Sequence, residues 1–253
     1  MSDSVDALVG RMRAALDELT AEGDPARFFL GTYLRITQAI GTAIDQDRFE
    51  DPRWVAAWDV DFAELYLDAL AAHRFPGASA PEPWRLAFTA DPGLPPEAHV
   101  LLGVNAHINY DLPQSMVRVI PPADMADADV LARRHRDHEA IDGVLATQVA
   151  GEDAALRAAG GRRTWLDRVA APANRAAVRV FLTESRRKVW ANTQQLHAAR
   201  LAGAAAYDRR VADLSDAAAA RVADLLRPGP VLLRLAVRGF GVRLPEVDDD
   251  QPG

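Results

Sequence analysis

Apolar residues recur three and four positions apart along most of this chain, the spacing that gathers side chains on one face of an α-helix. Alternation with a period of two, which is typical of half-buried strands, is scarce. Aspartate–proline pairs at 24–25 and 51–52 have the chemistry of helix starts. The pattern predicts helices over residues 5–19, 24–40, 54–72, 97–120, 124–148, 174–201, 215–226 and 231–242.

The breaks between these segments are short, and no internal repeat or long linker divides the chain. We expect loops at 75–83 and 92–96, a turn at 160–161, and a helix that starts at the N-cap Ser215. Pro113 lies inside an apolar segment and predicts a kink in that central helix. We therefore predict an all-α bundle of about eight to ten helices, with one domain over 1–247 and a disordered acidic tail at 248–253.

Composition narrows the class of protein without giving its activity. The 253 residues include no cysteine, which excludes disulfides, thiolate nucleophiles and cysteine-ligated metals. A net charge of −7 argues against nucleic acid as a partner. No apolar run reaches the length of about 18 residues that a transmembrane helix needs. Charged residues interrupt the N-terminal segment where a secretory signal would be apolar, so we expect a cytoplasmic protein.

The most informative segment is 101–116, where four polar side chains interrupt an apolar helix. His107 and Asp111 are four residues apart and therefore share one helical face, and Asn105 and Asn109 form a second such pair. Polar groups are costly to bury without partners or a purpose. We interpret His107 and Asp111 as catalytic or metal-binding residues and the asparagines as substrate-binding residues. The alternative is a hydrogen-bonded network that only locks the helices together.

The helix predicted at 124–148 carries two more histidine–carboxylate pairs with the same spacing. His138 and Asp142 are in phase with apolar residues and are predicted to face inward. Together with the pair on the central helix they would give four nitrogen and oxygen ligands for a divalent metal such as zinc, manganese or iron. His135 and Glu139 lie among arginines, and we expect them on a solvated face. Histidines that bind carboxylates without any metal are the alternative.

Acidic residues also line the helix predicted at 54–72. We expect either that Asp61 and Glu64 form an exposed stripe, or that one of them faces the central histidine as a general base or a further ligand. Asp59, at the start of this helix, is consistent with a purely structural role in the helix dipole. Arg35 and Trp190, on other helices, are further candidates for substrate binding.

Several segments resemble a family rich in actinobacterial proteins, catalogued as the domain of unknown function 5995. The similar segments, which span about residues 28–201, are FFLGTYLRIT, DPRWVAAWDVDFAELYLDAL, VNAHINYDLP, DHEAIDGVL and ESRRKVWANTQQL. The resemblance implies relatedness, and because the family carries no activity, it implies no function.

A weaker, local resemblance is to the metal helix of the helical zinc-dependent phospholipases C and nucleases. His107, Asp111 and Gln114 match the histidine, aspartate and glutamine of that helix. The chain departs from the pattern at Tyr110, Ser115 and Val117, which replace a glycine, a proline and a histidine. This resemblance implies a reduced site of one or two metal ions.

Three functions remain open from the sequence. The first is metal-dependent hydrolysis of a small or lipid-like substrate. The second is a metal-free cyclase or isomerase that acts on a hydrophobic intermediate of secondary metabolism. The third is a non-catalytic helical scaffold. Both enzymatic hypotheses require that His107 and Asp111 point together into a recess. The sequence contains no GxSxG, P-loop, GxGxxG or HExxH motif, which argues against the common hydrolases and oxidoreductases.

Overall fold

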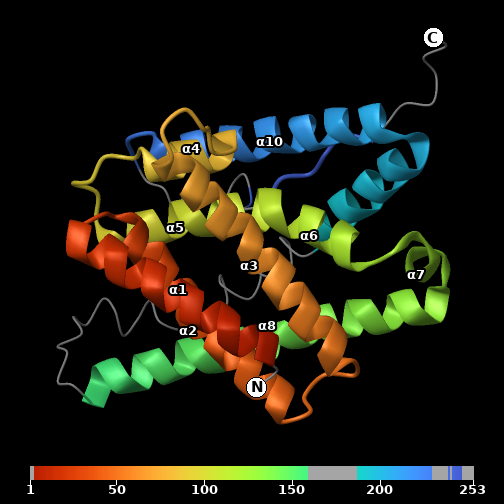
Figure 1. Ribbon diagram of the computed structural model, residues 1–253, viewed down its shortest axis with the longest axis horizontal. Coiled ribbons are helices and arrows are strands. Elements are labelled where there is room, and N and C mark those ends of the chain that lie inside the picture. The colour runs from red at the N-terminus through yellow and green to blue at the C-terminus, as the bar shows by residue number, and fades with distance from the viewer. Residues whose placement is uncertain (1–2, 159–186, 230–238, 240, 247–253) are drawn as a thin grey trace.

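The computed structural model describes the backbone of residues 3–158, 187–229, 239 and 241–246, and their side chains except 3, 142 and 145–158 (Figure 1). The turn predicted at 160–161, parts of the helices predicted at 174–201 and 231–242, and the tail 248–253 lie outside the described residues. Within the described ranges every regular element is helical, as predicted, and there is no strand.

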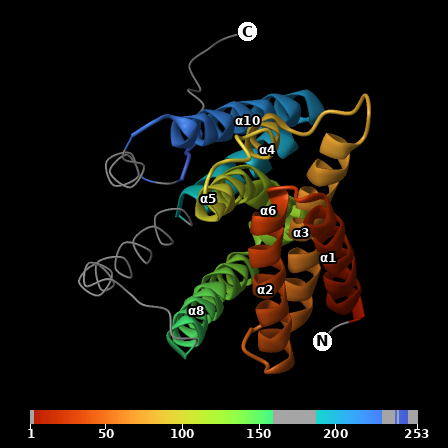
Figure 2. The same ribbon diagram turned by 90° about the vertical axis from the view of Figure 1, so that its left-hand side faces the viewer.

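Helices α1 (Asp3–Glu22), α2 (Ala26–Asp45) and α3 (Pro52–Arg74) pack side by side (Figures 1 and 2). The helix start predicted at the second aspartate–proline pair is confirmed, because the Asp51 side chain accepts a hydrogen bond of 3.0 Å from the Trp54 amide. At the first pair, the Asp24 side chain accepts from the Ala26 amide at 2.8 Å. The short connection over residues 46–51 makes α2 and α3 antiparallel neighbours.

The predicted central helix is divided into three consecutive elements, α5 (Pro96–Ala106), the π-helix η1 (His107–Asp111) and α6 (Leu112–Val119). Pro113 lies in the first turn of α6, where a missing amide hydrogen costs little. A short helix, α4 (Glu82–Phe88), precedes them, mostly between the loops predicted at 75–83 and 92–96, where the sequence predicted no helix. Seven residues are too few for a helical period to be recognised in the sequence.

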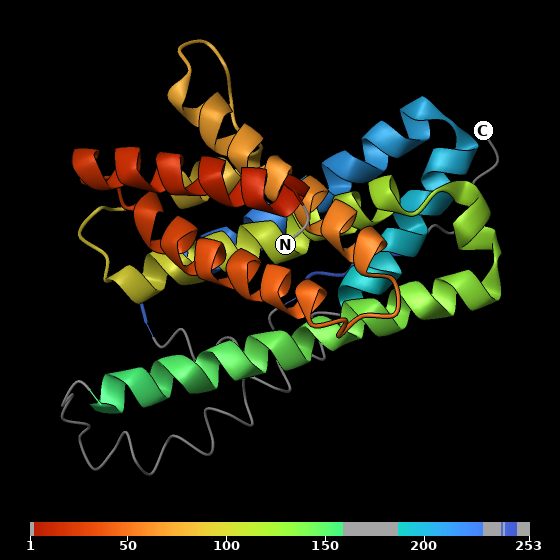
Figure 3. The same ribbon diagram turned by 60° about the horizontal axis from the view of Figure 1, so that its bottom comes forward.

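The helix predicted at 124–148 consists of α7 (Pro122–Ala126) and the long α8 (Ala128–Ala158), which are separated at Asp127. Figure 3 shows α8 running beneath α2. Residues 187–202 are helical, and α10 (Ala204–Leu226) lies along α4 and α5. The prediction that Ser215 caps a helix start is wrong, because α10 begins eleven residues earlier, after Gly203. A serine inside a helix has the same local chemistry as a serine at a cap, so composition alone misplaced this boundary.

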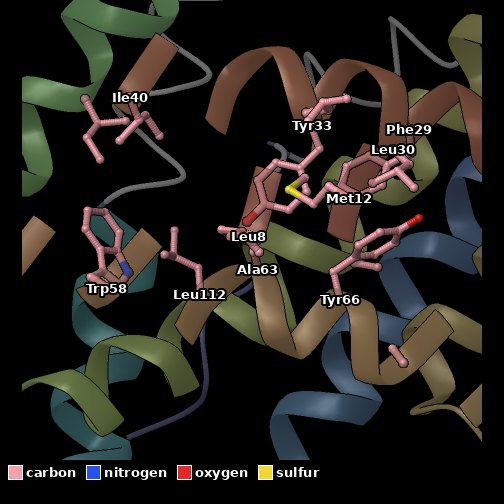
Figure 4. Packing of buried hydrophobic residues seen from close by; sticks show 14 of the residues in the cluster. Leu8, Met12, Phe29, Leu30, Tyr33, Ile40, Trp58, Ala63, Tyr66 and Leu112 are labelled. Carbon is pink, nitrogen blue, oxygen red and sulfur yellow. The ribbon is translucent and has the colours of Figure 1, made fainter. Parts of the chain in front are cut away.

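The main hydrophobic core lies between α1, α2, α3 and the central helix (Figure 4). Antiparallel packing aligns α2 with α3 in register. The Phe29 and Tyr66 rings are 5.1 Å apart, and the Tyr33 and Phe62 rings, one turn further along, are 6.1 Å apart. The register brings the side chains of these two helices against η1. Among the described residues, no helix is long and apolar enough to cross a membrane.

Candidate active site

The histidine and aspartate that the sequence singled out are in direct contact. His107 Nδ1 lies 2.8 Å from Asp111 Oδ2, and the two residues are only 3% and 1% exposed. The same carboxylate oxygen accepts a hydrogen bond of 2.8 Å from the indole Nε1 of Trp84, on α4. The prediction that the pair shares one helical face is therefore confirmed. The contacts of one oxygen with both the imidazole and the indole fix the Asp111 carboxylate and, through it, the orientation of the imidazole.

Both members of the pair belong to the π-helix. Its wider turn is seen in the hydrogen bond from the Leu112 amide to the His107 carbonyl, five residues back. Single π-turns inside α-helices are rare and occur frequently at functional sites. Here the widened turn coincides with the two residues of the pair and directly precedes Pro113.

Aromatic rings from three helices surround the imidazole. The Phe62 ring stacks on it face to face, with centroids 3.6 Å apart and an interplanar angle of 6°. The Tyr33 ring meets it edge-on at 4.6 Å. Three further rings have centroids within 5.8 to 6.3 Å of the imidazole: Phe29, Tyr66 and Trp84. We call these five rings the aromatic cluster. They give His107 an apolar environment of low dielectric constant.

This environment sets the protonation of the pair. Burial lowers the pKa of His107, and the hydrogen bond to Asp111 opposes that shift without reversing it. Burial also raises the pKa of Asp111, against the opposing effects of His107 and Trp84. The imidazole is therefore neutral at neutral pH. With Asp111 ionised, Nδ1 carries the hydrogen and donates it, which leaves a lone pair on Nε2.

His107 Nε2 is buried and has no hydrogen-bond partner among the described residues. The same holds for five oxygens on α2 and α3: the hydroxyls of Tyr33, Thr37 and Tyr66, and the carboxylate oxygens Asp59 Oδ2 and Asp61 Oδ2. Most buried polar atoms in native proteins are paired, so several unpaired ones in one region call for an explanation. Burial also raises the pKa of Asp59 to about 7. The sequence interpretation of Asp59 as a helix-dipole residue missed this inward position.

The asparagine pair of the same helix has its hydrogen bonds satisfied. Asn105 donates to the Leu101 carbonyl at 3.0 Å and accepts from Asn109 at 3.2 Å. The side-chain oxygen of Asn109 accepts from the Val242 amide at 3.1 Å. These contacts hold the segment 241–246 against the central helix. For this pair the geometry matches the locking network that the sequence left open as the alternative.

Three other candidates lie away from the imidazole. Glu64 forms an ion pair with Arg11 on α1, and Asp61 Oδ1 lies 3.8 Å from Arg118. Arg35 is exposed on α2, with its guanidinium 3.2 Å from the Thr32 hydroxyl. Phe62 lies between the two acids in sequence, and it is Phe62 that faces His107. The structure thus brings neither the acids nor Arg35 to the pair.

The remaining histidines lie on α8. His138 is buried as predicted, and its ring is 5.3 Å from that of Trp58 and 5.8 Å from that of Trp190. The side chain of Asp142 lies outside the described residues. No group of three or more histidine, aspartate or glutamate side chains suited to a metal occurs in the described part of the chain. Metal binding by the four proposed ligands stays a prediction.

His135 and Glu139 form an exposed pair, as expected from the arginines beside them. The two side chains are 42% and 58% exposed, and His135 Nδ1 lies 3.5 Å from Glu139 Oε1. Trp190, predicted to bind substrate, meets the His135 ring edge-on at 4.8 Å and lines a surface hollow with it.

The expected recess beside His107 is closed in this structure. The aromatic cluster covers the imidazole, and Phe62, which is only half-buried, forms the part of that cover nearest to solvent. Two surface hollows lie along α8 and between α2 and α8, and neither is lined by the aromatic cluster. Access to His107 therefore requires a movement of side chains.

The described residues define an all-helical protein whose central helix carries a buried histidine–aspartate pair on a π-turn. Over residues 5–228 the chain matches the model of a family described as "Family of unknown function (DUF5995)". The chain belongs to this family, and the resemblance drawn from its motifs is confirmed. No curated protein and no solved structure matches it. Arguments about its function therefore rest on the geometry of the site.

Proposed function

We propose that this protein is an enzyme that transfers a proton on a small hydrophobic substrate, in the manner of an isomerase or cyclase, with His107 as the base. The observation that carries the proposal is the unpartnered Nε2 of a buried imidazole whose other nitrogen is held by Asp111. A neutral imidazole with an open lone pair in apolar surroundings is a suitable general base.

The roles of the neighbouring residues follow from their contacts. Asp111 selects the tautomer and stabilises the imidazolium that forms when Nε2 takes a proton. Trp84 keeps the Asp111 oxygen in place through its indole hydrogen. The aromatic cluster excludes water and offers apolar surface to a substrate. The scaffold alternative gives no reason for leaving Nε2 without a partner, because an apolar side chain would fill the same space at less cost.

Phe62 is the gate of this site in the proposal. Its ring covers the face of the imidazole and is itself partly exposed, so rotation of this one side chain is the shortest route from solvent to His107. Side-chain rotations of this kind are fast compared with typical turnover.

The experiment measures exchange of carbon-bound hydrogen for deuterium by NMR. The full chain in D₂O is mixed with small hydrophobic ketones, among them cyclohexenone and acetophenone, whose hydrogens next to the carbonyl are acidic. We expect the wild type to accelerate exchange in at least one ketone. His107→Gln should reduce that acceleration by at least about 100-fold, the usual contribution of a general base.

His135→Gln is the matched control, because it removes a histidine with the same spacing to a carboxylate from an exposed surface. It should exchange at the wild-type rate. Circular dichroism and urea unfolding verify that each variant is folded. Wild-type exchange no faster than buffer, or equal rates for His107→Gln and wild type, would contradict the proposal.

A further inference from the structure

We propose that Tyr33 and Asp59 form an oxyanion site beside His107, in which both donate hydrogen bonds to the oxygen of a carbonyl substrate. The inference rests on the proposed function and names its substrate class: a hydrophobic ketone or aldehyde that passes through an enolate. Neither residue stood out in the sequence, and neither takes part in the hydrogen bonds between His107, Trp84 and Asp111.

The register of α2 and α3 places the two donors near one another. Along α2, Phe29 and Tyr33 face α3, and the buried Thr37 follows one turn after Tyr33. Phe29 packs on Tyr66 and Tyr33 packs on Phe62, and Asp59 lies three residues before Phe62, about one turn along α3. The negative charge of Asp59 acts on the Tyr33 hydroxyl, as expected for neighbouring groups. The Tyr33 ring is 4.6 Å from the imidazole.

The burial of these groups indicates a missing partner. Tyr33 is 4% exposed, Asp59 3% and Thr37 0%, and each has an oxygen without a hydrogen-bond partner in the described ranges. A buried polar group without a partner destabilises the folded protein. Ordered water satisfies such groups in many proteins, and a substrate oxygen that displaces the water makes the same bonds.

Both groups are donors at neutral pH. Burial, together with the negative charges of Asp59 and Asp111, raises the pKa of the Tyr33 hydroxyl, so the hydroxyl keeps its proton. Asp59, whose pKa is raised to about 7 by burial alone, is protonated in a large share of molecules. A carboxylic acid kept neutral by apolar surroundings donates a strong hydrogen bond to an oxyanion.

The chemical step balances with the residues present. His107 Nε2 takes the proton from the carbon next to the carbonyl, and the electron pair of that C–H bond forms the carbon–carbon double bond of the enolate. The π electrons of the carbonyl move to its oxygen, which accepts hydrogen bonds from Tyr33 and Asp59. The imidazolium then returns the proton to carbon, at the same position or at a conjugated one. No oxidant, reductant or second substrate is needed.

The test uses 4-nitrophenol, whose phenolate resembles an enolate and absorbs differently from the neutral phenol. We expect saturable binding to the full chain, with the absorption of the bound phenolate. Tyr33→Phe and Asp59→Leu should each weaken binding by about tenfold or more, the loss of one strong hydrogen bond. Asp59→Asn retains a donor and should weaken it less.

Glu139→Gln, on the exposed pair, is the control and should bind as the wild type does. Tyr33→Phe removes only an unpartnered hydroxyl, so it provides a folded variant even if Asp59→Leu is unstable. Absence of saturable binding, or binding unaffected by Tyr33→Phe, overturns the oxyanion site. Binding that depends on Tyr33 while the wild type exchanges no ketone supports the site and contradicts only His107 as the base.

Discussion

Two histidine–carboxylate pairs with identical spacing behave as opposites in this protein. His107 Nδ1 and Asp111 Oδ2 lie 2.8 Å apart, and both residues are almost completely buried. The same Asp111 oxygen also accepts a hydrogen bond from Trp84. His135 and Glu139 are 3.5 Å apart, exposed and surrounded by arginines in sequence. Spacing along a helix brings two side chains within reach in both cases. The surroundings decide whether the contact can change the chemistry of an imidazole.

A polar side-chain atom without a protein partner has different surroundings in the exposed pair and in the buried pair. On α8, water reaches any free nitrogen or oxygen of the exposed pair. Inside the aromatic cluster, Nε2 of His107 is buried and meets no hydrogen-bond donor among the described residues. That difference is the physical reason for assigning a reaction to one pair and none to the other.

The largest expected difference between the two pairs is the loss of free energy of unfolding when the carboxylate of each pair, Asp111 or Glu139, is removed. Asp111→Ala leaves the hydrogens of Trp84 Nε1 and His107 Nδ1 buried without an acceptor, and we expect it to lower the free energy of unfolding by about 3 to 5 kcal/mol. Glu139→Ala removes an exposed partner and should lower it by less than about 0.5 kcal/mol. Urea unfolding of both variants measures the difference. Similar losses would show that the pairs are energetically alike.

Asp59 is a buried acid without a basic partner among the described residues, and it should make the stability of the protein depend on pH. Its pKa is about 7 in the folded protein against 3.8 for an ordinary aspartate, so folding favours the protonated form. The stabilisation is complete below the unfolded pKa and is lost as the pH rises through 7. We expect the wild type to lose about 2 to 3 kcal/mol relative to Asp59→Asn between pH 5 and pH 8.

Urea unfolding of wild type and Asp59→Asn at the two pH values tests this slope, because other titrating groups contribute equally to both proteins. Glu139→Gln, as the exposed control, should differ from wild type by less than about 0.5 kcal/mol at either pH. A constant difference between wild type and Asp59→Asn would show that Asp59 is ionised in the folded protein.

The smallest effect concerns Tyr33. Its hydroxyl has no partner in the described part of the chain, so Tyr33→Phe breaks no hydrogen bond and removes a buried polar group. We expect the free energy of unfolding to stay the same or to rise by up to about 1 kcal/mol, as is common where function requires an unfavourable group. Thermal and urea unfolding measure it. A loss above about 1 kcal/mol would mean that the hydroxyl is bonded in the folded protein.

The parts of the site that the sequence predicted depend on local spacing. The contact between His107 and Asp111 follows from four-residue spacing, and its burial follows from apolar neighbours on both sides. The helical class follows from periodicity in the same way. Exposure of His135 and Glu139 follows from the arginines beside them.

The rest of the site depends on tertiary contacts that leave no local pattern. Trp84 is 27 residues from Asp111 and lies on a helix too short to show a period. Apolar residues occupy more than one face of α3, so its sequence did not distinguish the buried Asp59 from Asp61 and Glu64, which lie near arginines. The wider π-turn rotates the residues that follow it to a different face of the central helix, and a pattern with a period of 3.6 residues does not predict that rotation.

The most direct test of the central claim is the protonation of the two His107 nitrogens. Long-range ¹H–¹⁵N NMR of the full chain with ¹⁵N-labelled histidine reports it at pH 7, and the signals missing in His107→Gln give the assignment. The account predicts a neutral imidazole with hydrogen on Nδ1 and none on Nε2. Hydrogen on Nε2, in either the neutral or the charged ring, would contradict the assignment of His107 as the base.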